Sequence, residues 1–300
     1  MFYGFLFSSY GDIIKQTLVR FLMVYLILAV LSSVGVSVTM RLSTKKAAGS
    51  LVMLSCNYLV CLLISLLFAG FEGLFSFHSG NVGALWMGSI NGAFYLASFV
   101  LYQRSVKHSG MVLSSTFMKL GLLVPIVISV FFFLELPSLI QVVGFVIALA
   151  GIVLMQLGGK DHGGRFSPAL LLVLVLGGGA NAMSEVYESV GDPAYNSQFL
   201  LYTFFAAFLL CCILTLLRQE KPTRHSIFYG LLIGIPNYFS ARFLLLSLQH
   251  VPAMIAHPTY SALSVGIVSI LGLCIFKEHL AKRQWIAMGI ILISLIFLNI

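Results

Sequence analysis

The chain has 300 residues, of which 60% are hydrophobic and only 9% are charged, and its formal net charge is +8. Soluble globular proteins are roughly 25% charged, so this composition excludes a water-soluble domain and indicates that lipid surrounds most of the chain. A positive charge of this size would suit nucleic acid in a soluble protein, but no nucleic-acid-binding motif accompanies it, and we expect no such partner.

Ten apolar stretches are long enough to cross a membrane, which takes about 20 residues in a helix. They cover residues 20–40, 51–70, 82–103, 111–133, 138–157, 168–188, 197–217, 226–248, 253–276 and 284–300. The connectors between them are short and rich in glycine and proline, so no soluble domain fits between helices. The sequence therefore predicts an all-α polytopic membrane protein with ten transmembrane helices.

Basic residues lie in every second connector. Connectors 1–2, 3–4, 5–6, 7–8 and 9–10 hold 13 of the 17 Lys and Arg residues, and the four connectors between them hold none. Because cytoplasmic loops of membrane proteins are enriched in Lys and Arg, the pattern predicts that the basic connectors face the cytoplasm. With ten helices, both termini then lie outside. We expect the cell (inner) membrane as the location.

The two halves of the chain share short patterns. Glu135-x5-Gln141 recurs as Glu278-x5-Gln284, 143 residues later, and Asn91 in the third helix has a counterpart in Asn237 of the eighth. Each half has five helices, so the second copy must have inverted topology, which is typical of secondary transporters. The predicted units are an N-terminal lead-in (1–19), a first repeat (20–157), a cytoplasmic linker (158–167) and a second repeat (168–300).

The repeated motifs resemble those of a known family. Phe133-Leu-Glu135-x5-Gln141-x2-Gly144-x6-Gly151 in the first half and Phe276-Lys-Glu278-x5-Gln284-x4-Gly289 in the second are similar to motifs of the drug/metabolite transporter superfamily, specifically its ten-helix EamA-type bacterial members. This resemblance implies a secondary transporter whose central cavity is lined by helices 1, 3, 4, 6, 8 and 9, with helices 5 and 10 at the periphery. Known members move amino acids, nucleotide-like metabolites, sugars, choline or drugs. The best-described members place both termini in the cytoplasm, opposite to the charge pattern here.

Two cations lie inside apolar stretches. Lys119 is near the middle of the fourth span, where an ammonium costs roughly 2.5–3.5 kcal/mol, so it must face a polar cavity or a partner. It either attracts an anionic group of a solute or is neutralised by a fixed acid or by helix carbonyls. Arg242 lies nearer the end of the eighth span, where it either binds a substrate carboxylate or extends to the interface.

Other polar residues in the apolar spans are candidates for the same cavity. By analogy with small multidrug resistance proteins, Glu185 near the end of the sixth helix is a candidate for coupling to protons, or pairs with Lys119 or Arg242; a solvated helix-end role is the alternative. Polar side chains in lipid either join helices by hydrogen bonds or line a cavity. The candidates of this kind for solute binding are Asn91, Tyr95, Asn181, Asn237, His257 and Tyr260.

The leading hypothesis is a secondary active transporter of a small metabolite or drug, with a preference for an anionic or zwitterionic solute. No GxxxxGK loop for ATP is present, so H⁺ or Na⁺ is the expected coupling ion. We expect no cofactor and no metal, and a monomer or homodimer. Two alternatives remain: a membrane-embedded lipid-modifying enzyme, although no catalytic or metal-spaced cluster is evident, and a structural membrane protein.

Overall fold

The computed structural model describes residues 24–44, 50–70, 79–128, 138–157, 168–248, 253–278 and 281–297. Within these ranges the regular structure is entirely helical. The helices are a first helix (Val24–Ser43), α2 (Ser50–Ala69), α3 (Ser79–Ser109), α4 (Met111–Leu120), α5 (Leu123–Ile128), α6 (Leu139–Leu157), α7 (Pro168–Val190), the short η3 (Pro193–Tyr195), α8 (Asn196–Leu217), α9 (Arg224–Leu248), α10 (Ala253–Cys274) and α11 (Lys282–Phe297).

Each of the ten predicted spans contains a helix, so the prediction of an all-α membrane protein is confirmed. Seven of the described helices are long and apolar enough to cross a membrane, and two shorter apolar helices cover Met111–Pro125 and Leu139–Gly151. One expectation differs in form. The predicted fourth span is broken after Leu120, so that α4 and α5 replace a single helix. The predicted lead-in (1–19) and linker (158–167) lie outside the described residues.

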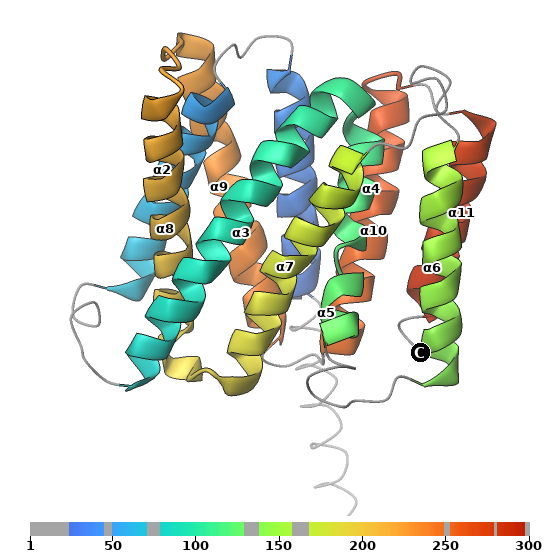
Figure 1. Cartoon of the computed structure of the whole chain (residues 1–300), viewed down its shortest axis with the longest axis horizontal. Helices are drawn as coiled ribbons and strands as arrows, with labels where there is room; N and C mark the ends of the chain where they lie inside the picture. The colour runs from blue at the N-terminus through green and yellow to red at the C-terminus, as the bar shows by residue number, and fades with distance from the viewer. Residues whose placement is uncertain are drawn as a thin grey trace, which may run out of the picture.

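Successive spans alternate in direction across the bundle (Figure 1). The first helix runs upward in this view and α7, which begins the second half, runs downward, as an inverted repeat requires. The first helix, α3, α8 and α10 all end at the upper edge, which we call the basic end. The described cations of the connectors there are Arg41, Arg104, Lys107, Arg218, Lys221, Lys277 and, at the helix starts, Arg224, Lys282 and Arg283.

Glycine pairs set the closest helix contacts. Gly88 and Gly92 of α3 face α8, and a side-chain carbon at Gly92 would lie 2.8 Å from Cβ of Ala206. Gly230 and Gly234 of α9 face α2 in the same way. Small residues four apart let helix backbones approach closely in membranes. The two glycine pairs are 142 residues apart, whereas Asn91 and Asn237 are 146 residues apart. The glycines are therefore the better match between the repeats. Relative to them, the two asparagines are offset by about one helical turn.

The glutamines of the repeated motif occupy equivalent places at helix starts. At the start of α6, Ser138 N donates to Gln141 Oε1 at 2.9 Å and Gln141 N donates to Ser138 Oγ at 3.2 Å. Before α11, Ala281 N donates to Gln284 Oε1 at 2.9 Å. The two bonds at the start of α6 form the reciprocal arrangement of a capping box, and the bond before α11 is one of the two bonds of such a box. This capping role explains why both copies of the motif carry Gln at this position.

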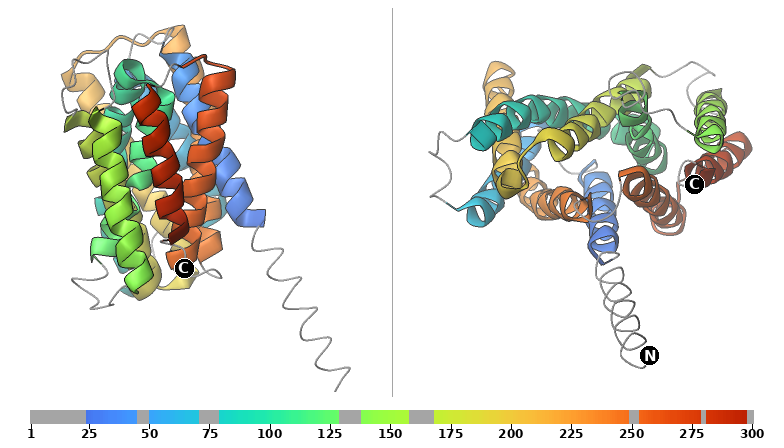
Figure 2. Two further views of the ribbon diagram at one scale, coloured as in Figure 1. Left: turned by 90° about the vertical axis from the view of Figure 1, so that its right-hand side faces the viewer. Right: turned by 90° about the horizontal axis from the view of Figure 1, so that it is seen from below.

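The distribution of polarity is that of a protein in lipid. Leu67, Leu139 and Leu216 are each at least 76% exposed, whereas Asn57 and Ser114 are fully buried. Such an apolar exterior needs the bilayer as its solvent. Seen from below, α6 and α11 lie side by side at one edge of the bundle (Figure 2), which agrees with the peripheral place implied for helices 5 and 10.

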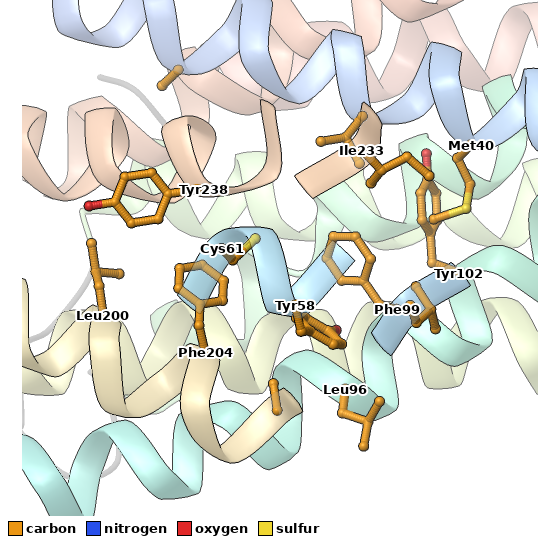
Figure 3. Close-up of a cluster of buried hydrophobic side chains, with 14 of the residues drawn as sticks. Met40, Tyr58, Cys61, Leu96, Phe99, Tyr102, Leu200, Phe204, Ile233 and Tyr238 are labelled. Atoms are coloured by element: carbon orange, nitrogen blue, oxygen red, sulfur yellow. The ribbon is translucent and has the colours of Figure 1, made fainter. Parts of the chain in front are cut away.

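Aromatic rings fill the core between α2, α3, α8 and α9 (Figure 3). Tyr58 and Phe99 meet edge to face with ring centroids 6.2 Å apart, and Phe204 and Tyr238 are 5.9 Å apart. The Tyr58 hydroxyl donates to the carbonyl of Tyr95 at 3.0 Å, so the buried ring leaves no polar atom unpaired. This packing fixes α3, which carries one wall of the cavity described next.

Candidate functional site

A cavity of ≈ 90 Å³ lies inside the bundle. Six helices line it: the first helix, α3, α4, α7, α9 and α10. These are helices 1, 3, 4, 6, 8 and 9 in order along the chain, the set that the sequence resemblance implied. The volume is well below the roughly 300–1,000 Å³ of sites for drug-sized ligands, so this conformation holds only a few non-hydrogen atoms.

The cavity brings together five of the predicted site residues and leaves four outside its lining. Those in the lining are Tyr95 of α3, Lys119 of α4, Asn181 of α7, and His257 and Tyr260 of α10. Those outside are Asn91, Glu185, Asn237 and Arg242.

Lys119 is the ninth residue of α4, about 12 Å along the helix from the basic end and thus near the middle of a bilayer. Its Nζ atom lies 3.8 Å from the centre of the Tyr260 ring, a cation–π contact. Among the described residues that line the cavity, none is Asp or Glu. The cavity wall therefore carries a positive group that rests on an aromatic face, and the described lining residues contribute no carboxylate.

The rest of the wall is rich in hydroxyl groups. The Tyr260 and Ser240 hydroxyls are 2.9 Å apart, and the Tyr102 hydroxyl donates to Ser37 Oγ at 2.9 Å. Ser261 Oγ donates to the carbonyl of Lys119 at 3.2 Å. Hydroxyls both donate and accept hydrogen bonds, so this wall can solvate a polar solute group from several sides.

Sequence reasoning missed these hydroxyl residues. The serines and Tyr102 of the lining are Ser33, Ser37, Ser98, Tyr102, Ser115, Ser240 and Ser261. A signal was present, because Ser33 and Ser37 in the first helix, and Tyr95, Ser98 and Tyr102 in α3, recur at spacings of three and four and so share one helix face.

The fourth span is broken just after Lys119, which lines the cavity. Leu122 N donates to the carbonyl of Lys119 at 3.3 Å and Val124 N to the carbonyl of Gly121 at 3.0 Å, the three-residue spacing of a tighter turn. Pro125 has no N–H, so it cannot make the next helical bond back to Gly121. The α4 helix consequently ends beside Lys119, and discontinuous helices of this kind line the solute sites of many transporters.

The glycine triplet of α7 packs against this break. A side-chain carbon at Gly121 would lie 2.7 Å from N of Gly178, and one at Gly177 would lie 2.7 Å from Sδ of Met118. A side-chain carbon at Gly179 would lie 2.8 Å from the ring of Phe94 in α3. The triplet lets α7, an unbroken helix, approach α3 and the α4–α5 turn, and Gly177 also lines the cavity.

His257 joins the cavity to an acidic group. Its Nε2 atom lies 3.9 Å from Oε2 of Glu185, and the side chains are 7% and 27% exposed. Glu185 belongs to α7 and stands behind the histidine. The sequence had offered Lys119 or Arg242 as its ion-pair partners, and the structure shows a contact of Glu185 with His257.

The remaining candidates make contacts between helices. Asn237 Nδ2 donates to Oδ1 of Asn57 at 3.1 Å and thereby ties α9 to α2. Asn91 Nδ2 donates to Oγ of Ser184 at 3.4 Å, between α3 and α7. Interhelical hydrogen bonds of this kind were the stated alternative to cavity lining.

Arg242 lies near the end of the bundle opposite the basic end. It is six residues before the end of α9, about 9 Å along the helix. Its Nη1 atom donates to Oγ of Ser197 at 2.7 Å, and its guanidinium carbon lies 4.9 Å from the centre of the Phe68 ring. The guanidinium is thus held between α2 and α8, outside the cavity.

Comparison with known proteins agrees with this architecture. A model described as the EamA-like transporter family matches residues 20–157 and 168–300. A protein of Haemophilus influenzae (strain ATCC 51907 / DSM 11121 / KW20 / Rd), described only as uncharacterized, is 25% identical over 282 residues, which are 87% of this chain and 92% of that protein. A protein crystal structure has a TM-score of 0.61 at 15% identity, covering 93% of this chain and 97% of its own, and supports the fold alone. The chain is a multi-pass membrane protein that belongs to the EamA-like transporter family, within the drug/metabolite transporter superfamily.

Proposed function

We propose that the protein is a secondary active transporter of a small anionic or zwitterionic solute, which it carries by alternating access through the cavity. The observation that carries the proposal is the charge of the wall: Lys119 contributes an ammonium and none of the described lining residues contributes a carboxylate. A group of opposite charge on the solute would offset the cost of this cation in the membrane interior. The small volume favours compact solutes with a carboxylate or a phosphate.

The contact between Tyr260 and Lys119 supports the same proposal. Its ring covers the Lys119 ammonium at 3.8 Å, and such a contact is worth roughly 0.5–2 kcal/mol, less than a full counter-ion provides. The ammonium is therefore held in place by a contact weaker than an ion pair. Hydroxyls of Ser240 and Ser261 stand nearby to bind the polar part of a solute.

The pair His257 and Glu185 supports a role in coupling. A histidine and a carboxylate 3.9 Å apart, one of them in the cavity wall, can exchange a proton once solute binding brings them within hydrogen-bond distance. We extend the proposal to H⁺ as the coupling ion, with Na⁺ the other outcome of the test. By the charge of its connectors, the protein resides in the cell membrane with the basic end in the cytoplasm and both termini outside.

The direct test is solute binding to the purified protein, measured as a rise in melting temperature over a panel of small anions, zwitterions and cations. A ligand at about 100 times its dissociation constant stabilises by about 2.7 kcal/mol. We expect anions or zwitterions to raise the melting temperature and Lys119→Ala to abolish the rise. Lys107→Ala is the matched control, since Lys107 is exposed at the basic end. An equal rise in Lys119→Ala and the unaltered protein would contradict the proposal.

A further inference from the structure

Buried side chains pack into two clusters that divide the bundle at the cavity. The first cluster draws mainly on the first helix, α2, α3, α8 and α9, and the second on α4, α5, α6 and α11, while α7 and α10 contribute to both. The cavity lies on the boundary, because Ser33 and Tyr95 come from the first set of helices and Ser115 and Lys119 come from α4. A solute path through the bundle must therefore open along this boundary.

Glu278 follows the end of α10 at the basic end and is fixed to the start of α4. Its carboxylate accepts hydrogen bonds from N of Met111 at 2.8 Å and from N of Val112 at 3.0 Å. First-turn N–H groups have no acceptor within their own helix and carry the positive end of its dipole, so they hold an anion well. Gly110, with φ of 86°, leaves room for the carboxylate, since a side-chain carbon there would lie 3.0 Å from Oε2.

Arg41 of the first helix, a helix of the first cluster, reaches the same carboxylate. Its Nε atom lies 3.0 Å from Oε1 of Glu278, and its Nη1 atom donates to the carbonyl of Val106 in α3 at 3.4 Å. The Glu278 side chain is 8% exposed and that of Arg41 is 24% exposed, so the carboxylate is largely shielded from water. The guanidinium thus belongs to the first helix and α3, whereas the carboxylate belongs to α10 and α4.

Buried apolar side chains lie next to this pair, at the basic end of the bundle. Met40, Val106 and Met111 are fully buried in the cluster near the pair. Closer to the cavity, the hydrogen bond from Tyr102 to Ser37 joins α3 to the first helix. Buried apolar side chains next to a charged pair form a barrier to a polar solute. Opening this barrier requires the Arg41–Glu278 ion pair to separate.

We propose that the Arg41–Glu278 ion pair is a latch that holds the basic end of the cavity shut, and that solute crosses this end only after the pair separates. The proposal rests on the transport function proposed above. The bonds from Glu278 to α4 persist in both states, because α10 and α4 pack against each other. The moving parts are then the two packing clusters, which combine helices of both sequence repeats.

Glu220 provides a matched control within the same chain. Its carboxylate accepts a hydrogen bond from N of Leu51 at 2.8 Å, near the basic end, and so also holds the start of a helix. This contact joins the segment after α8 to α2, and both helices belong to the first cluster. It does not cross the boundary and needs no release during transport.

The test measures access to the cavity from the basic end. Ser37→Cys places a thiol in the wall just inside the latch, and its rate of reaction with a membrane-impermeant maleimide is measured in vesicles above the background of the five native cysteines. Vesicles that present the basic end outward are identified by labelling of Lys107→Cys. We expect Arg41→Gln and Glu278→Gln to raise the rate about tenfold, as loss of a charge-assisted hydrogen bond predicts. Glu220→Gln is expected to leave it unchanged.

Equal rates in all three variants and in the Ser37→Cys reference would overturn the latch. The labelling requires no solute, so this failure is distinct from a failure of solute binding at Lys119. Should Glu278→Gln lower the melting temperature by loosening α4, Arg41→Gln decides the test alone, because it leaves the bonds from Glu278 to α4 in place. A rise in Glu220→Gln equal to that in Arg41→Gln would also overturn the proposal.

Discussion

Lys119 carries a charge where the surrounding solvent is lipid, and the structure shows how the chain accommodates it. The side chain points into a polar cavity, its ammonium rests on the ring of Tyr260, and its own carbonyl accepts a hydrogen bond from Ser261. Each contact is weaker than an ion pair. A cation held by contacts of this kind is suited to bind and release an anion repeatedly.

Glu185 is the residue on which coupling to protons depends in this account. We expect Glu185→Gln to retain exchange of solute across the membrane and to lose accumulation driven by a proton gradient, because the amide cannot take up a proton at the contact with His257. The measurement is solute uptake with and without an imposed pH difference. Gradient-driven uptake that is unchanged in Glu185→Gln, or that follows Na⁺ instead, would contradict proton coupling through this residue.

At the scale of elements, two features that position the cavity come from glycine and proline. Pro125 ends the hydrogen bonding that would make the fourth span continuous, and the bare backbone of Gly178 lets α7 pack against the resulting turn. The paired glycines of α3 and α9 bring these helices close to α8 and α2. The distances between the backbones of these helices are therefore short because glycine has no side chain to hold them apart.

Gly92→Ala tests the contact between α3 and α8. The added carbon would lie 2.8 Å from Cβ of Ala206, closer than packed carbons tolerate, so the helices must separate. We expect a loss of about 1–3 kcal/mol in the free energy of unfolding, the usual cost of overpacking. Gly266→Ala is the control, because no atom lies within 4 Å of its added carbon. Thermal unfolding in detergent compares the two, and equal melting temperatures would contradict the close contact.

At the scale of the whole molecule, the charge pattern predicts an orientation opposite to that of the best-described relatives. The start of the first helix and the end of α11 lie at the end of the bundle away from the basic connectors (Figure 1). We expect a reporter fused after Ile300 to lie outside the cytoplasm. A reporter enzyme that is active only outside the cytoplasm should therefore be active in this fusion. A fusion that is active only as a cytoplasmic reporter would reverse the orientation, and a fusion after the basic connector at Lys107 serves as the opposite control.

Hydropathy and spacing predicted much of the fold. The ten spans follow from apolar length, and the inverted repeat follows from the shared motifs and the five helices in each half. Hydropathy and spacing did not predict the break beside Lys119, because the apolar run from 111 to 133 is continuous and Pro125 is its only local sign. The sequence predicted only some of the residues that line the cavity. Lys119 and Tyr260 line it, but Arg242 and Asn237 point elsewhere, because the rotation of each helix about its axis is fixed by packing that one sequence does not display.

The central claim is that solute crosses the membrane through the cavity that Lys119 lines. Its most direct test is uptake of the best-binding anion or zwitterion into proteoliposomes that contain the purified protein. We predict saturable uptake by the unaltered protein and by Lys107→Ala, and loss of that uptake in Lys119→Ala at equal protein content and melting temperature. Uptake by Lys119→Ala at the rate of the unaltered protein would contradict the claim.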